Sequence, residues 1–237
     1  SCYGRKIMTG ILYGVGVGPG DPSLLTLSAI QCIETADAVA YPCLEGTASF
    51  ARHVVENYLK SDQEEIPIII PMKQDPEPAQ LAYDQAAEHL FTRIKKGKNV
   101  AVLCEGDPFF YGSFQFLFYR LAKKCSVKII PGVSSLMSCA ASLALPLAAR
   151  NDVLSVLPAP LPNTVLQACL NVADTAAIIK LGRHFSRIKD LLSSLNLDQS
   201  AYYIERSSLP NEKIEQLENI DPSKVPYFSM ILVNKRS

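Results

Sequence analysis

Short apolar runs bounded by glycine, proline or aspartate alternate along this chain with longer stretches in which apolar residues recur three or four positions apart. The short runs are typical of buried strands, and the longer spacing is typical of helices with one buried face. "ILYGVGV" is the first predicted strand and "ADAVAYP" the second. The stretch between them predicts a helix over about 22–34, with one apolar stripe formed by Leu24, Leu27, Ile30 and Ile33. This alternation predicts an α/β fold with largely parallel strands.

A second strand, turn and helix follow in "NVAVLCEGDPFFYGSFQFLFYRLAKK". Val100 to Cys104 reads as a buried strand, and the helix after it has a buried face formed by Phe114, Leu117, Phe118 and Leu121. The chain therefore has Gly-Asp-Pro twice, at 20–22 and 106–108, each time after a predicted strand. Open α/β sheets bind their ligands at this end of the strands.

The order and length of the predicted elements change in the second half of the sequence. "VKIIPGVSS" predicts a strand and turn, and "SLMSCAASLALPLAAR" predicts a helix ending before Pro146. After Arg150 come four short strands, "DVLSVLPA", "TAAIIKLG", "SAYYIERS" and "YFSMILVN". We expect an N-terminal α/β domain over 8–130 and a C-terminal one over 131–237, with the boundary somewhere between 125 and 150.

Two polar stretches are expected at the surface, and residues 1–7 belong to no predicted element. "DPEPAQ" near residue 75 reads as a loop, and "RIKKGK" at 93–98 as a helix end and turn. Residues 1–7 precede Met8 and the first predicted strand, so they contribute nothing to the predicted fold.

Composition narrows the partner to a small molecule. The 237 residues include 23 Lys and Arg and 23 Asp and Glu, so no global field attracts nucleic acid or an anionic membrane. The apolar stretch at 136–149 is too short to span a bilayer, and we expect neither a transmembrane helix nor a signal peptide. The seven cysteines form no C-x-x-C pair, and their odd number fits a reducing cytoplasm best.

The opening loop "GVGVGPGD" at 14–21 fails the usual nucleotide fingerprints. The third glycine of G-x-G-x-x-G is replaced in each register, by Pro19, Asp21 or Ser23, and the chain contains no Gly-Lys-Ser/Thr. An aspartate in each loop would also repel a phosphate, by roughly 4 kcal/mol at ~4 Å near a surface. A phosphate-free ligand with hydroxyls, an ammonium or a sulfonium fits better, as S-adenosylmethionine does. The alternative is that Asp21 and Asp107 are only helix N-caps.

A protein-bound metal is not expected. The three histidines, His53, His89 and His184, share no metal-ligand spacing.

Several motifs in order resemble the tetrapyrrole methylase family. "YGVGVGPGDPSLLTLSAIQCIETADAVAYP", "LCEGDPFFYGSF" and "IIPGVSS" carry the family likeness. "GVGVGPGDP", "LCEGDPFFYGS" and "IERSSLPNEKI" are similar to the branch that methylates carbon 20 of precorrin-2 or cobalt-factor II during cobalamin synthesis. The resemblance implies two α/β domains, S-adenosylmethionine as the cofactor, a reduced tetrapyrrole as the substrate, and a homodimer.

The resemblance also implies site residues. The implied cofactor contacts are Pro19, Glu105, Gly106, Asp107, Phe110, Tyr111, Ser113, Ser134, Ser135, Lys180, Leu181 and Ser207. On the reacting side the candidates are Asp21, for a pyrrole N–H or proton loss, Tyr111, and Arg150, for a substrate carboxylate. Surface solvation of Arg150 and simple packing of Tyr111 remain alternatives. So do methylation of another tetrapyrrole position, such as that of uroporphyrinogen III, and a non-catalytic nucleotide-binding module.

Overall fold

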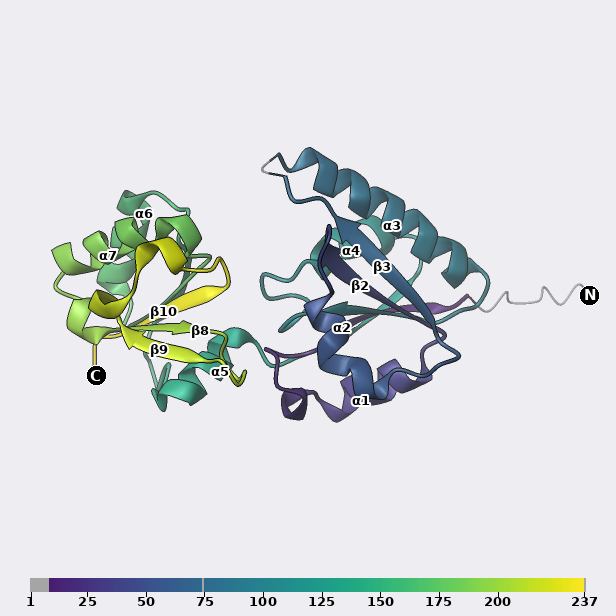
Figure 1. Ribbon diagram of the computed structural model, residues 1–237, viewed down its shortest axis with the longest axis horizontal. Coiled ribbons are helices and arrows are strands. Elements are labelled where there is room, and N and C mark those ends of the chain that lie inside the picture. Colours follow the sequence, from purple (N-terminus) through teal and green to yellow (C-terminus); the bar gives the residue numbers. More distant parts are fainter. Residues whose placement is uncertain (1–8, 74, 237) are drawn as a thin grey trace, which may run out of the picture. The chain divides into compact units, whose positions relative to one another are not determined.

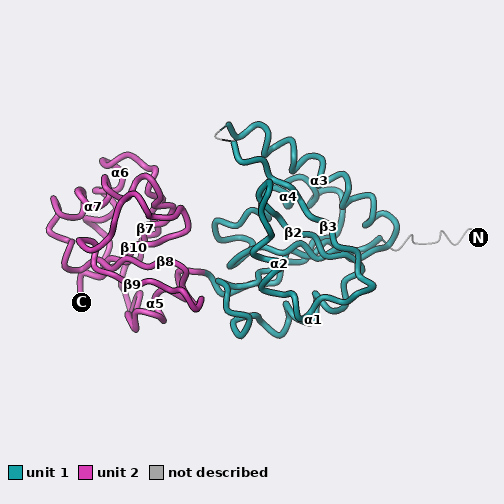
Figure 2. Tube along the Cα trace, viewed as in Figure 1, with its two compact units in different colours: residues 1–134 teal, residues 135–237 magenta. Residues whose placement is uncertain are grey.

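The computed structural model describes residues 9–73 and 75–236 (Figure 1). Met8, where the first predicted domain begins, lies outside the described residues. The chain divides into two compact units, residues 1–134 and 135–237 (Figure 2). Each unit has its own five-stranded sheet and its own hydrophobic core.

The first unit is built on an entirely parallel sheet with strand order β3-β2-β4-β1-β5. Its strands are β1 (Ile11–Gly16), β2 (Ala38–Leu44), β3 (Glu64–Ile70), β4 (Val100–Cys104) and β5 (Ser126–Ile130). All five residues of β4 are buried, as expected for a central strand covered on both faces. The parallel arrangement predicted for this half of the chain is confirmed.

Helices cover both faces of this sheet. α1 (Leu27–Thr35) and α2 (Phe50–Val55) pack on one face, and α3 (Glu77–Lys95) and α4 (Phe114–Leu121) on the other (Figure 1). The predicted apolar face of α4 is buried at Phe114, Leu117 and Leu121. Short 3₁₀ helices occur at Pro22–Leu24 and Glu56–Tyr58.

Two predicted boundaries in this unit are wrong. The helix predicted over 22–34 is a 3₁₀ turn followed by α1, because the Thr26 side chain accepts a hydrogen bond from Ala29 N (3.0 Å) and starts a new helix. The predicted loop "DPEPAQ" at 75–80 contributes its last four residues to α3, whose N-cap is Pro76. Proline early in a helix is favourable because its missing N–H is not needed there.

The second unit has a mixed sheet with order β6-β7-β10-β8-β9. Its strands are β6 (Leu154–Pro158), β7 (Thr175–Ile179), β8 (Ala201–Glu205), β9 (Lys213–Gln216) and β10 (Ser229–Asn234). β10 runs antiparallel to β7 and β8, and β9 antiparallel to β8, so the prediction of largely parallel strands is wrong for this half. The short connection between β8 and β9 permits only antiparallel pairing.

Helices again cover both faces. α5 (Ser135–Leu143) packs on one face, and α6 (Asn163–Val172) and α7 (Phe185–Ser194) on the other. The remaining 3₁₀ helices are Gly182–His184, Asp198–Ser200, Leu217–Asn219 and Pro222–Lys224. Because β6, β7 and β8 all run in the same direction, their carboxyl ends share one edge of this sheet.

Candidate functional site

The loops after β1, β4 and β5 meet at the carboxyl edge of the first sheet, because these three strands are parallel neighbours. Val17 donates its N–H to the Cys104 carbonyl (2.9 Å). Gly18 and Gly106 exchange both backbone hydrogen bonds (3.2 and 2.9 Å). The two Gly-Asp-Pro loops are therefore joined backbone to backbone beyond the ends of their strands.

Three glycines allow this close approach. A Cβ on Gly16 would lie 2.6 Å from Gly132 N, and a Cβ on Gly132 would lie 2.1 Å from Gly106 O. Both neighbouring atoms belong to the backbone, so they cannot move aside as the end of a side chain can. Gly106 in addition has φ +64, a conformation that residues with a Cβ rarely adopt. Glycine is thus required here for the packing of three loops on one another.

Asp107 holds two of these loops together. Its Oδ1 accepts a hydrogen bond from Phe109 N (2.9 Å) within its own loop, and its Oδ2 accepts one from Gly132 N (2.9 Å) in the loop after β5. It does not cap α4, which begins at Phe114. The helix-cap alternative is therefore wrong for Asp107, and its carboxylate links the β4 loop to the β5 loop.

Asp21 does act as a cap. Its Oδ1 accepts a hydrogen bond from Ser23 N (2.8 Å) and starts the 3₁₀ helix Pro22–Leu24. Hydrogen bonds to Ser23 lower the pKa of this carboxyl. The second unit repeats the arrangement, because Asp221 accepts from Ser223 N (3.0 Å) in the same Asp-Pro-Ser sequence. Capping of a 3₁₀ helix is therefore enough to explain the Asp-Pro-Ser sequence at both places. Asp221 can serve as a control for Asp21, since it caps a helix in the same way.

The β4–α4 loop presents several of the predicted cofactor residues. Glu105, Phe110 and Tyr111 are exposed, and the rings of Phe110 and Tyr111 meet edge to face with centroids 5.1 Å apart. Tyr111 has φ 53, a left-handed conformation that is rare for a bulky residue and often found at functional sites. Although the Glu105 side chain reaches solvent, desolvation by the protein atoms around it raises the pKa of its carboxyl. Ser113 lies against Tyr83 and Cys104.

Pro19 and Ser134 are the remaining predicted cofactor residues of the first unit. Pro19 is half-buried between Gly18 (φ +78) and Gly20 (φ 145), so the opening loop turns on glycine at both sides of it. The Cα of Ser134 would lie 3.7 Å from a Cβ on Gly106, beside the β4 loop. Ser135 belongs to the second unit, where it is the first residue of α5. The two serines therefore stand on either side of the boundary between the units.

In the second unit the structure places Lys180, Leu181 and Ser207 at one edge of the sheet, after β7 and β8. Lys180 has φ 59, so this residue too has a left-handed backbone. Leu181 is fully buried in the core with Ile178 and Phe185, which leaves its backbone for any ligand contact. Ser207 is buried as well, with its hydroxyl 2.5 Å from that of Ser138.

Arg150 is not brought together with these three residues within the second unit. It precedes β6 and lies in a turn closed by a hydrogen bond from Asp152 N to Ala149 O (3.0 Å). Because β6 begins after it, the turn belongs to the amino edge of the strand, opposite to the edge that holds Lys180 and Ser207. Its side chain is exposed and its φ is 51.

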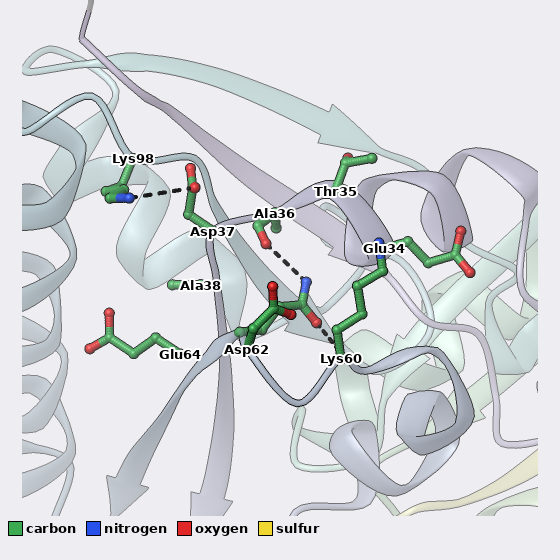
Figure 3. Close-up of a pocket in the computed structure, with 10 residues that line it drawn as sticks. Glu34, Thr35, Ala36, Asp37, Ala38, Lys60, Asp62, Glu64 and Lys98 are labelled. Atoms are coloured by element: carbon green, nitrogen blue, oxygen red, sulfur yellow. Dashed lines mark hydrogen bonds and ion pairs between the residues drawn. The ribbon is translucent and has the colours of Figure 1, made fainter.

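A surface depression of about 420 Å³ lies elsewhere, at the amino edge of the first sheet (Figure 3). Its lining includes Glu34, Asp62 and Lys60, and Lys98 forms an ion pair with Asp37 there (3.7 Å). It contains none of the residues predicted to bind cofactor or substrate. Its wall is formed by strand starts and solvated charges, whereas the glycine loops lie at the opposite edge, so the depression is not the candidate site.

Two further findings concern the described residues alone. Within 9–73 and 75–236 there is no group of three or more His, Cys, Asp and Glu side chains placed to hold a metal ion. In the same part of the chain no helix has the length and apolar character needed to cross a membrane.

Some residues with structural roles at these edges have no such role in the sequence motifs. The sequence predicts no site role for Gly16, Gly132, Ser138, Ser142 or Glu212. A glycine in "IIPGVSS" directly after a strand was the available signal for Gly132. The sequence gives no comparable signal for Ser138, Ser142 or Glu212, because their contacts join segments that are about 70 residues apart.

Comparison with known proteins supports the resemblance. Residues 11–221 match the family described as Tetrapyrrole (Corrin/Porphyrin) Methylases. The chain is 39% identical to the cobalamin biosynthesis protein CobIJ of Mycobacterium tuberculosis, over 94% of this chain and 46% of that protein. It thus spans about half the length of that relative.

Two other proteins are similar along nearly their whole length. The chain is 37% identical to a precorrin-2 C(20)-methyltransferase of a Sinorhizobium species, over 94% of this chain and 95% of the relative. Its fold matches the crystal structure of uroporphyrin-III C-methyl transferase from Thermus thermophilus complexed with S-adenyl homocysteine. That match has a TM-score of 0.67 and 24% identity, and covers 95% of this chain and 98% of the other. The chain belongs to the tetrapyrrole methylase family.

Proposed function

We propose that this chain transfers the methyl group of S-adenosylmethionine to carbon 20 of precorrin-2, or of its cobalt complex, in cobalamin biosynthesis. The observation that carries the proposal is the alignment with the Sinorhizobium precorrin-2 C(20)-methyltransferase, which extends over 94% of this chain and 95% of that enzyme. The match to half of CobIJ is consistent with this assignment.

The loops at the carboxyl edge of the first sheet fit a phosphate-free cofactor. The segments 17–23, 105–113 and 131–134 contain no Lys or Arg, and they carry three carboxylates, Asp21, Glu105 and Asp107. Such a site favours a cationic ligand over an anionic one. The Thermus enzyme with the same fold was solved with S-adenyl homocysteine, which supports the same cofactor class here. When bound, S-adenosylmethionine supplies an electrophilic methyl group on a sulfonium sulfur.

The residues of this chain would then act mainly by alignment. A reduced tetrapyrrole is electron-rich and enamine-like at the bridging carbon, so no side chain need create a strong nucleophile. Holding sulfur, methyl and carbon in line can contribute roughly 7–11 kcal/mol to catalysis. The joined glycine loops supply a rigid backbone frame for this alignment, and Phe110, Tyr111 and Ser113 would line the cofactor from the β4 loop.

The two loop aspartates take different roles in this proposal. Positive charge leaves the sulfur in the transition state, so a carboxylate pressed against the sulfonium would stabilise the ground state more. Asp107, whose oxygens hold Phe109 N and Gly132 N, instead keeps the loops in place. The lowered pKa of Asp21 makes it a weak base, so we assign it to accepting a hydrogen bond from a substrate pyrrole N–H.

Further parts of the proposal rest on the family likeness and on the chemistry of single residues. Arg150 would bind a substrate carboxylate, and Lys180, Leu181 and Ser207 would contact the cofactor from the second unit. We propose a homodimer, which light scattering at micromolar concentration tests. We also propose a reducing cytoplasm, with which the free thiols of Cys32, Cys104 and Cys139 are compatible.

An anaerobic incubation with S-adenosylmethionine and either precorrin-2 or its cobalt complex tests the proposal. Mass spectrometry should show one methyl group added per macrocycle. Methylation of uroporphyrinogen III instead would favour the alternative that the chain methylates another tetrapyrrole position. Cofactor binding without methylation of any tetrapyrrole would favour a non-catalytic module and contradict the proposal.

A further inference from the structure

The loop at 206–212, between β8 and β9, has an unusual backbone. Arg206 has φ 53 and Ser208 has φ 70, so two residues with a Cβ on either side of Ser207 adopt the left-handed conformation. Such conformations are unfavourable for these residues and persist only where neighbouring contacts enforce them. The loop follows β8 directly, at the edge of the sheet where Lys180 follows β7.

Glu212 supplies the enforcing contact. Its Oε2 accepts a hydrogen bond from Ser208 N (2.8 Å) within the loop and another from Ser142 Oγ (2.7 Å) in α5. Since α5 packs on the face of the sheet, the carboxylate fastens the loop to a rigid element. Hydrogen bonds to an ionised acceptor are about twice as strong as neutral ones.

The hydroxyl of Ser207 is directed inward to the same helix. Its Oγ lies 2.5 Å from Ser138 Oγ and 3.4 Å from Ser142 Oγ, and the residue is only 7% exposed. Ser138 and Ser142 are one turn apart on α5, so they form one polar row beneath the loop. With that hydroxyl and Ser208 N both engaged, the other backbone groups of residues 206–208 are what this stretch offers a ligand.

We propose that Glu212 is a positioning residue. With the Ser138 and Ser142 hydroxyls it holds the backbone of residues 206–208 in the left-handed shape that receives S-adenosylmethionine, whereas the Ser207 side chain makes no ligand contact. The inference deepens the proposed function and rests on it. Glu212 would act on cofactor binding and not on the methyl transfer itself, because it touches the loop and the helix, not the reacting atoms.

The test measures the Kd of S-adenosylhomocysteine by calorimetry, and KM and kcat for S-adenosylmethionine with precorrin-2. Glu212→Ala should raise Kd and KM by about tenfold or more, while kcat at saturating cofactor stays within about twofold. Glu212→Gln keeps one acceptor oxygen and should recover part of the affinity. Ser142→Ala removes the hydrogen bond from α5 to Glu212 but leaves the one from Ser208 N, so it should raise Kd by a smaller factor.

Glu218→Ala is the matched control, because Glu218 is an exposed glutamate nearby with the same charge. It should leave Kd within about twofold of the wild type. Each variant is assayed well below its melting temperature, and Ser142→Ala and Glu212→Gln serve if Glu212→Ala does not fold. A wild-type Kd in all three variants overturns the inference. A wild-type chain that binds no S-adenosylhomocysteine would instead overturn the proposed function.

Discussion

The carboxylate of Asp107 accepts the N–H of Gly132 across two loops that are 25 positions apart in the sequence, with an Oδ2–N distance of 2.9 Å. Its other oxygen accepts the N–H of Phe109 (2.9 Å). One side chain thus fixes the shape of the β4 loop and its place beside the β5 loop. The family likeness had implied a ligand contact for Asp107, whereas the structure adds a prior role in holding the loops that would surround the ligand.

Substitution of Asp107 by Asn tests this link. The amide has one acceptor oxygen in place of two, so either Gly132 N or Phe109 N loses its partner. An unsatisfied backbone N–H costs about 1–3 kcal/mol when it is shielded from water. We expect a lower melting temperature and an increase of about tenfold in the Kd of S-adenosylhomocysteine, measured by calorimetry. An unchanged Kd and melting temperature would show that the link is dispensable.

The close approach of Gly132 to the Gly106 carbonyl predicts that Gly132→Ala strongly lowers stability and cofactor binding. The new Cβ would lie 2.1 Å from the Gly106 carbonyl oxygen, and the loops would have to separate. We expect destabilisation at or above the upper end of about 1–3 kcal/mol, together with loss of cofactor binding. Urea denaturation and calorimetry measure the two effects.

Gly46→Ala is the comparison for that variant. Gly46 also lies in the first unit, but a Cβ there has no atom within 4 Å, and only its φ of +78 opposes the substitution. Its cost should stay near about 1–2 kcal/mol with cofactor binding retained. Equal effects of the two substitutions on binding would contradict the account of the joined loops.

The repeated Asp-Pro-Ser tripeptide separates capping from function. Asp21→Asn and Asp221→Asn each keep a side-chain oxygen that can cap the 3₁₀ helix, and each remove the negative charge. If Asp21 also accepts a hydrogen bond from the substrate, only Asp21→Asn should lower kcat/KM for the tetrapyrrole, by about tenfold. Steady-state kinetics decides the matter, and a pair of variants with the same activity would leave Asp21 with the cap alone.

Thiol reactivity follows from burial. Desolvation raises the pKa of Cys139 to about 12 and that of Cys32 to about 11. A raised pKa keeps a thiol protonated, so at pH 8 roughly one Cys139 in ten thousand and one Cys32 in a thousand carry the reactive thiolate. We expect iodoacetamide to spare both in the native protein and to modify both in urea, as mass spectrometry of peptides would show. Rapid native alkylation of Cys139 would mean that α5 separates from its sheet.

Local pattern predicted much of the fold. The parallel order of the first unit follows from alternating strands and helices, and the buried face of α4 follows from the spacing of Phe114, Leu117 and Leu121. Helix starts are harder to predict. Asp21, followed by proline, has the stronger sequence pattern for an N-cap, but it caps only a 3₁₀ turn, and α1 starts at the Thr26 cap. The antiparallel insertion of β10 between β7 and β8 depends on contacts remote in sequence, which no local pattern encodes.

The candidate site was predicted in part for the same reason. Strand-end glycines and Gly-Asp-Pro repeats pointed to the loops that the structure joins at Gly18 and Gly106. The partners of Asp107 and Ser207 could not be inferred, because Gly132 and Ser138 reach them only through the fold. The charge of Arg150 favours a substrate carboxylate, whereas its position at the amino edge of β6 depends on the direction of that strand.

The most direct test of the central claim is to locate the transferred methyl group. The chain is incubated without oxygen with S-adenosylmethionine labelled with ¹³C in its methyl group, in parallel with precorrin-2 and with its cobalt complex. The product is then examined by carbon NMR. The account predicts a single labelled methyl on carbon 20, and the preferred substrate shows whether cobalt is present before methylation. A label on any other carbon, or none on either macrocycle despite bound cofactor, would contradict it.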